Sequence, residues 1–319
     1  MLKYLAVRIV AVIPLLLAVA VISFGLVGLL ELRGSAAEQI LQEGAGDPAA
    51  VAALEAELGL DKPLPIRFLH WLGDAIRFDF GNSLLFRDAS VTELIGERIW
   101  PTLSIMAVGL FIGSVVGIAF GMVSALRPGG GADRSLSVIS AMMIATPGFV
   151  LGILLIIVFA VQLGWFEPTG YSWPGDDGWW AWLKSLVLPG VALAFPIVAV
   201  VQRQLRSSMT NALSSRYVLA ARARGLPPGH IVRRHAMRNA MIPTITVIGF
   251  QAAAAIGLTV AIERVFAIPG MGSLLVQAVA QRDIPIVQGS LMVATLIVAV
   301  VNLLVDLAYG WLNPRIRLS

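Results

Sequence analysis

The stretch RYVLAARARGLPPGHIVRRHAMRNAMIP, from Arg216 to Pro243, is strongly basic and lies between two very apolar parts of the chain. Between Arg203 and Arg238 there are eight arginines, two histidines and no acidic residue, so this segment holds eight of the 23 Lys and Arg side chains. A cationic segment between apolar runs is typical of a loop that joins two membrane spans on the cytoplasmic side. The rest of the chain supports that interpretation.

The composition is that of a membrane protein. Of the 319 residues, 58% are hydrophobic and 13% are charged, and the mean hydropathy is +0.85. An ordinary soluble domain is about 25% charged, and a soluble fold of this size could not bury so much apolar side chain. The chain has no cysteine, which excludes disulfides, thiolate metal sites and a cysteine nucleophile.

Six runs of the sequence lack Asp, Glu, Lys and Arg for long enough to cross a bilayer, which needs about 20 apolar residues. They are Ile9–Leu30, Ile99–Leu126, Ser135–Phe166, Ser185–Gln202, Asn239–Ile262 and Ile284–Val305. The fourth run is short and contains Pro189 and Pro196, which predicts a kinked or interrupted helix. The first run exceeds the h-region of a signal peptide, about 7–15 residues, so we expect it to remain as an anchor.

The Lys and Arg residues predict the orientation of these spans. They gather in the amino terminus, the loop after the second run, the loop 203–238 and the carboxyl tail, whereas the short segments between are acidic or neutral. If every run crosses once, the basic segments share one side, which the positive-inside rule identifies as the cytoplasm. We therefore expect an all-α polytopic membrane protein of six transmembrane helices with both termini in the cytoplasm.

This topology divides the chain into three parts. Residues 1–30 form the first span, residues 31–98 form an extracytoplasmic helical insertion, and residues 99–319 form a core of spans two to six that includes the loop 203–238. In the insertion, residues 49–60 have a helix-forming composition.

An apolar helical face follows in the insertion, on Phe68, Trp71, Leu72 and Ile76. Such a face suits a helix that lies in the membrane interface, where aromatic rings favour the headgroup level. It equally suits a small cap packed on the ends of the spans, and the sequence leaves both possibilities open.

Glycines recur every four residues along the second run, at Gly109, Gly113, Gly117 and Gly121. This spacing places them on one stripe of a helix, where a neighbouring backbone can approach closely. We expect the stripe to serve helix packing; a smooth surface for helices that slide during a transport cycle is the alternative.

The sequence offers little support for chemistry in this chain. The three histidines lie outside the six runs, which argues against an intramembrane metal or haem site, a histidine-dependent protease, and a carrier driven by a midplane proton relay. No lysine follows a glycine-rich phosphate loop, so any ATP must be bound by another subunit. We expect no enzyme activity, no metal and no cofactor in this chain.

The basic loop has more pattern than retention of positive charge requires. Attraction to anionic membrane lipid, worth about 1 kcal/mol per residue near the surface, would explain its arginines. It would not explain the short helix predicted from Arg216, with Gly225 after its end and Pro227 beyond. No folded basic domain accompanies the loop, so nucleic acid is a poor partner. A docking surface for a cytoplasmic protein is the better interpretation.

YVLAARARGLPPGHIVRRHAMRNAMIP resembles the cytoplasmic coupling loop of ABC-transporter permeases, specifically those of the dipeptide/oligopeptide/nickel importer family. Other segments resemble the first permease subunit of that family in the same order: MLKYLAVRIVAVIPLLLAV, LGLDKPLPIRFLHWLG, GNSL, ERIWPTLSI and QRDIPIVQGSLMVATLIVAVVNLLVDLAYGWLNPRIR. The resemblance covers essentially the whole chain.

The resemblance implies a type I ABC importer permease in the bacterial cytoplasmic (inner) membrane. Its expected partners are a homologous second permease, two ABC ATPase subunits that bind ATP and Mg, and an extracytoplasmic peptide-binding protein. The expected substrate is a di- or oligopeptide, with nickel chelates or other small solutes as the alternative within the class. A stand-alone secondary carrier or channel is the alternative from outside it.

The resemblance also assigns roles by position. The permease pattern Glu-Ala-Ala, three residues, then Gly falls on Leu219, Ala220, Ala221 and Gly225, with Leu219 in place of the glutamate. Tyr217, Arg222 and Arg224 complete the expected ATPase-coupling set, and the two arginines are candidates for the polar contacts of the missing acid.

Two further expectations concern the outer side and the pore. The family's Pro-Gly-Asp-Pro sequence is delayed here, with Gly46, Asp47 and Pro48 following an insertion on the face that should receive the binding protein. The candidates for pore-lining residues are the polar side chains within the runs, Gln251, Thr259, Ser290 and Asn302.

Overall fold

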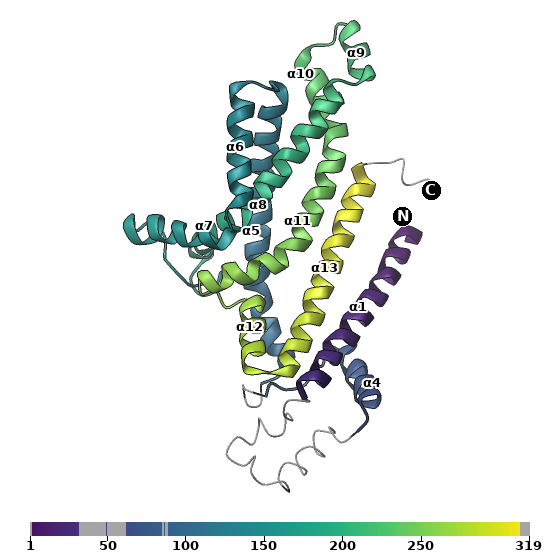
Figure 1. The fold of residues 1–319 in the computed structure, drawn as a ribbon, viewed down its shortest axis with the longest axis vertical. Helices are drawn as coiled ribbons and strands as arrows, with labels where there is room; N and C mark the ends of the chain where they lie inside the picture. The colour runs from purple at the N-terminus through teal and green to yellow at the C-terminus, as the bar shows by residue number, and fades with distance from the viewer. Residues whose placement is uncertain (1, 32–48, 50–61, 85, 87–88, 313–319) are drawn as a thin grey trace. The chain divides into compact units, whose positions relative to one another are not determined.

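The computed structural model describes residues 2–31, 49, 62–84, 86 and 89–312 (Figure 1). Regular structure in this part of the chain is helical, apart from an isolated antiparallel bridge between Asn82 and Ser90. Three segments lie outside the described residues: residues 32–48, which contain Gly46, Asp47 and Pro48, most of the helix-forming stretch 49–60, and the arginines of the carboxyl tail.

The described helices follow the order of the apolar runs. They are α1 (Leu2–Glu31), α4 (Leu64–Ala75), α5 (Val91–Leu126), α6 (Gly131–Ala145), α7 (Gly148–Leu155), the π-helical η2 (Ile156–Gln162), α8 (Trp179–Leu213), α9 (Arg216–Ala223), α10 (Pro228–His230), the π-helical η3 (Ile231–Ala236), α11 (Met237–Val265), α12 (Met271–Gln281) and α13 (Ile284–Leu312).

The chain forms two compact units. The first comprises residues 1–99 and 274–299, and the second comprises residues 100–273 and 300–319. Helices α5, α12 and α13 each contribute to both units.

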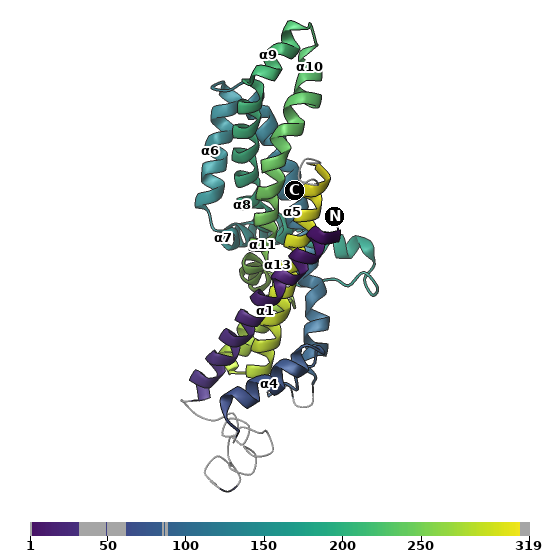
Figure 2. The same cartoon turned by 90° about the vertical axis from the view of Figure 1, so that its right-hand side faces the viewer.

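Helix α8 is the centre of the second unit. Fifteen of its 35 residues are buried, and Leu193, Ile197 and Val201 belong to the main apolar core. Helices α5, α6, α7 and α11 surround it in Figures 1 and 2. α8 is unbroken across Pro189 and Pro196, so the interruption considered from the sequence is absent. Both prolines lie within the packed part of the helix, where contacts with neighbours offset the lost backbone hydrogen bonds.

The glycine stripe of α5 lies against α8, residue for residue. The nearest atom to a β-carbon on Gly109, Gly113, Gly117 or Gly121 would lie 2.6–2.8 Å away, in Leu193, Ile197, Val201 or Leu205, respectively. Both series rise by four residues, so the two helices run parallel in close contact. Each glycine accommodates one bulky buried side chain of α8, which is the arrangement that small residues permit between membrane helices.

The third apolar run is bent rather than straight. Helices α6 and α7–η2 meet at an angle of 98° across Thr146 and Pro147. Proline has no N–H to continue the helix, and it forces the preceding residue out of the helical region; Thr146 has ψ 118°. Beyond the bend, Gly148 allows α7 to approach α8, because a β-carbon there would lie 3.1 Å from the carbonyl oxygen of Ala192.

In the first unit, α4 packs against α1 through aromatic rings. The ring of Phe24 lies 5.4 Å from that of Phe68 and 5.9 Å from that of Trp71, between centroids. Leu64, Ile66 and Leu69 of α4 are exposed. The predicted apolar face is therefore used for packing on the first span, and α4 has further apolar surface available.

Asp283 joins two segments of the first unit that lie far apart in the sequence. Its fully buried carboxylate accepts hydrogen bonds from the Ser83 hydroxyl at 2.6 Å and from the Leu84 amide at 3.0 Å. It also accepts a bond from the amide of Ile286 in the first turn of α13, at 3.3 Å. Asp283 thus caps α13 and holds the GNSL segment, residues 81–84, in place.

Within the described residues, four helices are long and apolar enough to span a membrane. They are Val91–Leu126, Trp179–Leu213, Pro228–Val265 and Ile284–Val305; the bent pair Gly131–Ala145 and Gly148–Gln162 makes a fifth if it counts as one span. In the first run, Val10–Gly25 is an apolar helix of shorter described length.

Candidate coupling loop

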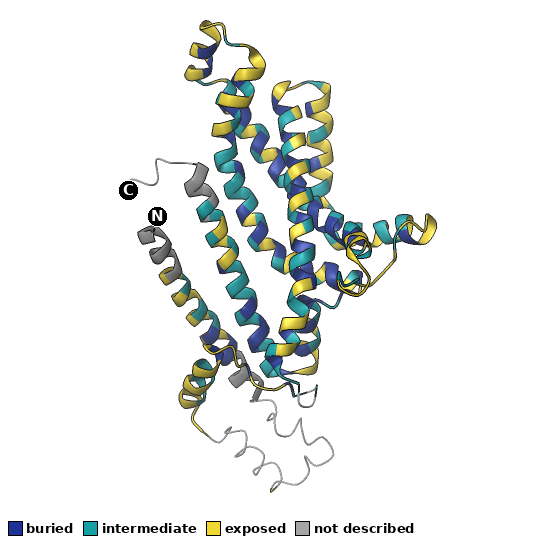
Figure 3. Ribbon diagram, turned by 180° about the vertical axis from the view of Figure 1, so that it is seen from behind, coloured by how far each residue is buried: buried dark blue, intermediate teal, exposed yellow. Residues whose placement is uncertain are grey.

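The loop 203–238 begins on α8 and ends on α11, with α9, α10 and η3 between them (Figures 1 and 2). Figure 3 shows mostly exposed residues around α9 and α10, with a few buried positions inside. The loop is therefore a small folded knob rather than a flexible connection.

A Schellman turn ends α9. Gly225 has φ +75°, a left-handed conformation that costs an L-residue with a side chain about 1–2 kcal/mol. The amide of Gly225 donates to the carbonyl oxygen of Arg222 at 2.9 Å, and that of Leu226 donates to Ala221 at 3.3 Å. The role of Gly225 is therefore to reverse the chain at the end of α9.

The knob has an apolar core of its own. Val218, Ala221 and Ile231 are buried together, and Leu226 packs against them. Ala221 therefore faces inward, whereas Ala220 is exposed. Adjacent residues of a helix point about 100° apart, so the two alanines that the family pattern pairs have different surroundings in this chain.

The outer surface of α9 is formed by the remaining residues of the predicted coupling set. Leu219 is 55% exposed and Tyr217 is 41% exposed; Arg222 and Arg224 are exposed as well. The Asn239 side-chain amide donates to the Tyr217 hydroxyl at 2.9 Å, which connects α9 to the first turn of α11. An exposed leucine beside two arginines can bind a cleft that combines apolar and acidic groups.

Two further arginines continue this surface onto η3. Arg233 and Arg234 are exposed, and the rings of His230 and His235 lie 5.7 Å apart between centroids. The sequence between Arg203 and Arg238 has no acid that could neutralise them. The knob therefore presents a net positive surface to any partner.

An ion pair supports the base of the loop. The Arg206 guanidinium donates from Nη2 to Asp133 Oδ2 at 2.7 Å and from Nε to Oδ1, joining α8 to the start of α6. The Gly129 amide donates to the same carboxylate at 2.8 Å. Asp133 precedes the third apolar run, and its hydrogen bond with Arg206, together with that from Gly129, lowers its pKa to about 2. This bidentate pair fixes the orientation of α8 as it enters the loop.

The predicted pore-lining residues do not share one environment. Thr259 is buried and donates a hydrogen bond to the carbonyl oxygen of Ile256 in its own helix, at 2.8 Å. Ser290 is also buried, Gln251 is partly exposed, and Asn302 is exposed. Only Gln251 and Asn302 have side chains at the surface of this chain.

The structure adds a buried acid that the sequence reasoning missed. Glu263 is fully buried near the end of α11. Its carboxylate accepts hydrogen bonds from the Thr102 hydroxyl and the Ser273 amide, both at 2.7 Å. The Thr102 hydroxyl also accepts a bond from the amide of Met271, the first residue of α12, at 2.9 Å.

Glu263 therefore holds the turn between α11 and α12 against α5. Gly270 and Gly272 lie directly against its carboxylate; a β-carbon on Gly272 would be 2.9 Å from Oε2. Glu263 directly follows the fifth uncharged run, Asn239–Ile262, so the sequence predicts that it lies in the outer loop after that span. The nearby IPGMG segment, residues 268–272, was the available signal, because two glycines after a proline permit the backbone to approach a side chain closely.

The comparisons with known sequences identify one family. The family described as binding-protein-dependent transport system inner membrane component matches residues 117–318. The chain is 40% identical to a probable peptide ABC transporter permease protein of Sinorhizobium fredii, over 87% of this chain and 92% of the relative. It is 39% identical to a putative peptide permease protein of Brucella ovis, over 100% of both chains. It is 36% identical to the glutathione transport system permease protein GsiC of Salmonella choleraesuis, over 99% of both.

Solved structures have the same fold at low sequence identity. An inward-facing structure of the MetNI methionine ABC transporter matches with a TM-score of 0.56 and 19% identity, over 69% of this chain and 96% of that one. An amino acid ABC transporter matches with a TM-score of 0.53 and 17% identity, over 69% and 94%. The chain belongs to the family of inner membrane components of binding-protein-dependent transport systems, and it is a multi-pass permease subunit of an ABC transporter.

Proposed function

We propose that this permease forms half of the translocation pathway of an ATP-driven importer of di- or oligopeptides. The observation that carries the proposal is the folded knob at α9, which presents Leu219 and a set of arginines outward from a packed core. Support for the substrate comes from relatives named as peptide permeases and from one named for glutathione, itself a tripeptide. The proposed second permease, of homologous fold, supplies the other half of the pathway.

The proposed topology has six spans and both termini in the cytoplasm, with residues 31–98 outside. Its support is the distribution of Lys and Arg, with α9 and η3 falling in the most basic segment. The bent pair α6 and α7–η2 counts as the third span in this scheme, and α1 counts as the first.

Coupling works through α9 in this proposal. Two partner ATPase subunits bind ATP with Mg²⁺, and each accepts one permease knob in a surface cleft. When the ATPases close, force on the exposed residues Leu219, Ala220 and Arg222 passes through the core around Val218 and Ile231 to α11. ATP changes the equilibrium between inward- and outward-facing states only to the extent that it binds them with different affinity.

The chemistry of transport on this chain is noncovalent. Peptide arrives from an extracytoplasmic binding protein, which supplies the selectivity, and crosses between the two permeases. Gln251 and Asn302 are the pore-lining candidates with surface-accessible side chains.

The decisive experiment is purification of the tagged protein from its native membrane in mild detergent. We expect a second permease and two ATPase subunits, identical or different, to co-purify. After reconstitution with the binding protein, this complex should take up peptide in an ATP-dependent manner. Recovery of this chain alone, with uptake that needs no ATP, would overturn the proposal in favour of a stand-alone carrier.

A substrate test separates peptides from nickel chelates. Uptake of labelled di- and oligopeptides is measured in the reconstituted importer in competition with an excess of a nickel chelate. We expect unlabelled peptide to compete and the chelate to have no effect; the reverse result would reassign the substrate while leaving the importer assembly intact.

A further inference from the structure

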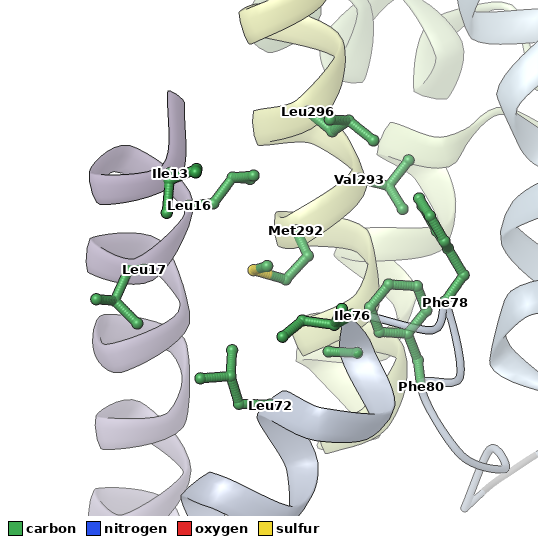
Figure 4. Close-up of a pocket in the computed structure, with 11 residues that line it drawn as sticks. Ile13, Leu16, Leu17, Leu72, Ile76, Phe78, Phe80, Met292, Val293 and Leu296 are labelled. Atoms are coloured by element: carbon green, nitrogen blue, oxygen red, sulfur yellow. The ribbon is translucent and has the colours of Figure 1, made fainter. Parts of the chain in front are cut away.

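An apolar pocket lies in the first unit, between α1, α4 and α13. Its volume is about 510 Å³, and Figure 4 shows side chains from the three helices and the following loop around one common space. The lining residues are Ile13, Leu16, Leu17, Leu72, Ala75, Ile76, Phe78, Phe80, Met292, Val293 and Leu296. All eleven are hydrophobic, so the pocket offers water no side-chain hydrogen bond.

Water is a poor occupant of such a space. A buried water needs two to four polar partners, and an apolar cavity of about 150 Å³ stays dry and accepts benzene instead. The pocket here is more than three times that volume. Left empty, its walls would lose the dispersion contacts that close packing normally supplies. The chain belongs to an inner-membrane family, so lipid hydrocarbon is the surrounding apolar medium.

The openings of the pocket favour a thin, flexible occupant. Ile13 and Leu17 on α1 line the space and are also exposed, as is Ile76, which is 73% exposed at the end of α4. The pocket is therefore open alongside α1, whereas Leu72 of α4 lies at one end of it in Figure 4.

A transmembrane helix of a partner does not fit these dimensions. A spanning helix needs about 20 residues, whereas the lining residues of α1 and α13 fall within residues 13–17 and 292–296, about one turn of each helix, so the pocket is far shorter than a spanning helix. Helix α4 also blocks the direction in which a spanning helix would continue. An acyl chain can enter from the side and end inside the pocket.

We propose that this pocket is a specific lipid-binding site, which holds one acyl chain of a membrane phospholipid between the first and last spans. Leu16 and Met292, from α1 and α13, form its opposite walls. The proposed topology, with residues 31–98 outside, places this site in the outer leaflet. That placement rests on the proposed function, whereas the acyl-chain site itself does not.

The test uses the full chain with the subunits that co-purify with it, reconstituted in vesicles that contain phosphatidylglycerol with a photoreactive diazirine in one acyl chain. After illumination, we expect labelled peptides that include residues 13–17 and 292–296. Leu16→Trp and Met292→Trp fill the pocket and should each lower this labelling several-fold.

Leu15→Trp is the matched control, because Leu15 is an exposed neighbour on α1 that does not line the pocket. We expect labelling of the pocket peptides to be unchanged in this variant. Thermal unfolding of each purified variant shows whether a loss of label reflects a filled pocket or a misfolded protein; Leu296→Phe provides a milder filling variant. Equal labelling in filled and control variants would overturn the site.

A second readout identifies a protein occupant. A benzoylphenylalanine at Met292 should crosslink to lipid; crosslinking to another polypeptide would overturn the acyl-chain assignment. The chain has no native cysteine, so a membrane-impermeant thiol reagent would label only the new cysteine of Lys62→Cys. The side from which this cysteine reacts shows on which side of the membrane α4 begins, and therefore in which leaflet the pocket lies. Reaction at that position only from the cytoplasmic side would refute the proposed topology and not the pocket, which the photolabelling decides by itself.

Discussion

Gly225 shows how one backbone angle shapes the surface that the partner ATPase is proposed to bind. The residue has open space around its α-carbon, so a β-carbon would meet no neighbour. Its φ of +75° nevertheless disfavours side chains. The requirement at this position is therefore conformational rather than steric, and it follows from the two hydrogen bonds that close α9.

Gly225→Ala should reduce ATP-dependent uptake by disturbing the end of α9, at a conformational cost of about 1–2 kcal/mol. Gly225→Asn should retain more uptake, because asparagine tolerates the left-handed region better than alanine. Gly229→Ala is the control, since Gly229 also has open space but no positive φ. Uptake and the amount of protein in the membrane are measured for all three. Equal uptake by the Gly225→Ala and Gly229→Ala variants would contradict the proposed role of the turn.

Glu263 has a different kind of importance, because its hydrogen bonds join three segments of the second unit. In Glu263→Gln the amide group would replace one acceptor oxygen and confront either the Thr102 hydroxyl or the Ser273 amide. Leaving a buried donor without an acceptor costs about 1–3 kcal/mol. The thermal midpoint of the purified variant should fall. Glu97→Gln, at an exposed position, should not change it; an unchanged midpoint in both variants would show that the cluster contributes no stability.

At the scale of the helix, the α5–α8 contact depends on matched positions rather than on apolar character alone. Gly113→Ala places a β-carbon 2.6 Å from Ile197 Cγ2 and should destabilise the protein. Gly96→Ala on the same helix meets open space and should be neutral or stabilising, because alanine is the better helix former.

The partner residue provides a stricter test of that contact. Ile197→Ala removes the side chain that Gly113 accommodates, so the double variant Gly113→Ala/Ile197→Ala should be more stable than the sum of the two single changes predicts. Thermal unfolding of the four proteins gives the coupling. Simple additivity would mean that the two positions do not meet as described.

Asp133 and Arg206 make a contact between helices that depends on ionisation. The folded-state pKa of Asp133, about 2, lies below the unfolded value of about 3.9. The pair therefore contributes stability above pH 4 and loses it as the pH falls toward 2. Thermal midpoints of the wild type and Asp133→Asn should differ by a constant amount from pH 8 to pH 5 and converge below pH 4. A difference that stays constant down to pH 2 would show that folding does not lower the pKa of Asp133.

For the whole molecule, the sequence predicted what depends on charge and local pattern. The helical class and the short helix ended by Gly225 follow from the uncharged runs and from local turn chemistry, and they are present in the structure. Of the kink or interruption predicted at Pro189 and Pro196, the interruption is absent, since packing of α8 against its neighbours outweighs the local cost of a proline. The bend at Pro147 was missed because a count of uncharged residues does not register where the backbone turns.

The environments of single side chains were the hardest to predict. The sequence pattern pairs Ala220 with Ala221, but only the folded knob brings Ile231 over Ala221. The sequence predicts a loop position for Glu263. Its burial could not be predicted, because it depends on contacts with Thr102 and Ser273 that form only in the folded protein. Burial of a polar side chain depends on such tertiary contacts, and one sequence contains no direct record of them.

The assembled importer offers the last prediction, at Leu219. This side chain is exposed in the single chain, and a leucine in that position is expected to be covered by an ATPase subunit. In inside-out vesicles, Leu219→Cys should react with a membrane-impermeant maleimide when the permease is expressed alone, and it should be protected several-fold when the ATPase subunits are co-expressed.

Arg134→Cys serves as the control, because Arg134 is exposed in the other basic loop of the same proposed side. It should react in both preparations, and the absence of native cysteine removes background labelling. Protection of Leu219→Cys alone locates the ATPase contact on α9. Reaction of neither residue would place these loops on the opposite side of the membrane, whereas undiminished reaction of both in the assembled importer would mean that α9 is not the coupling element.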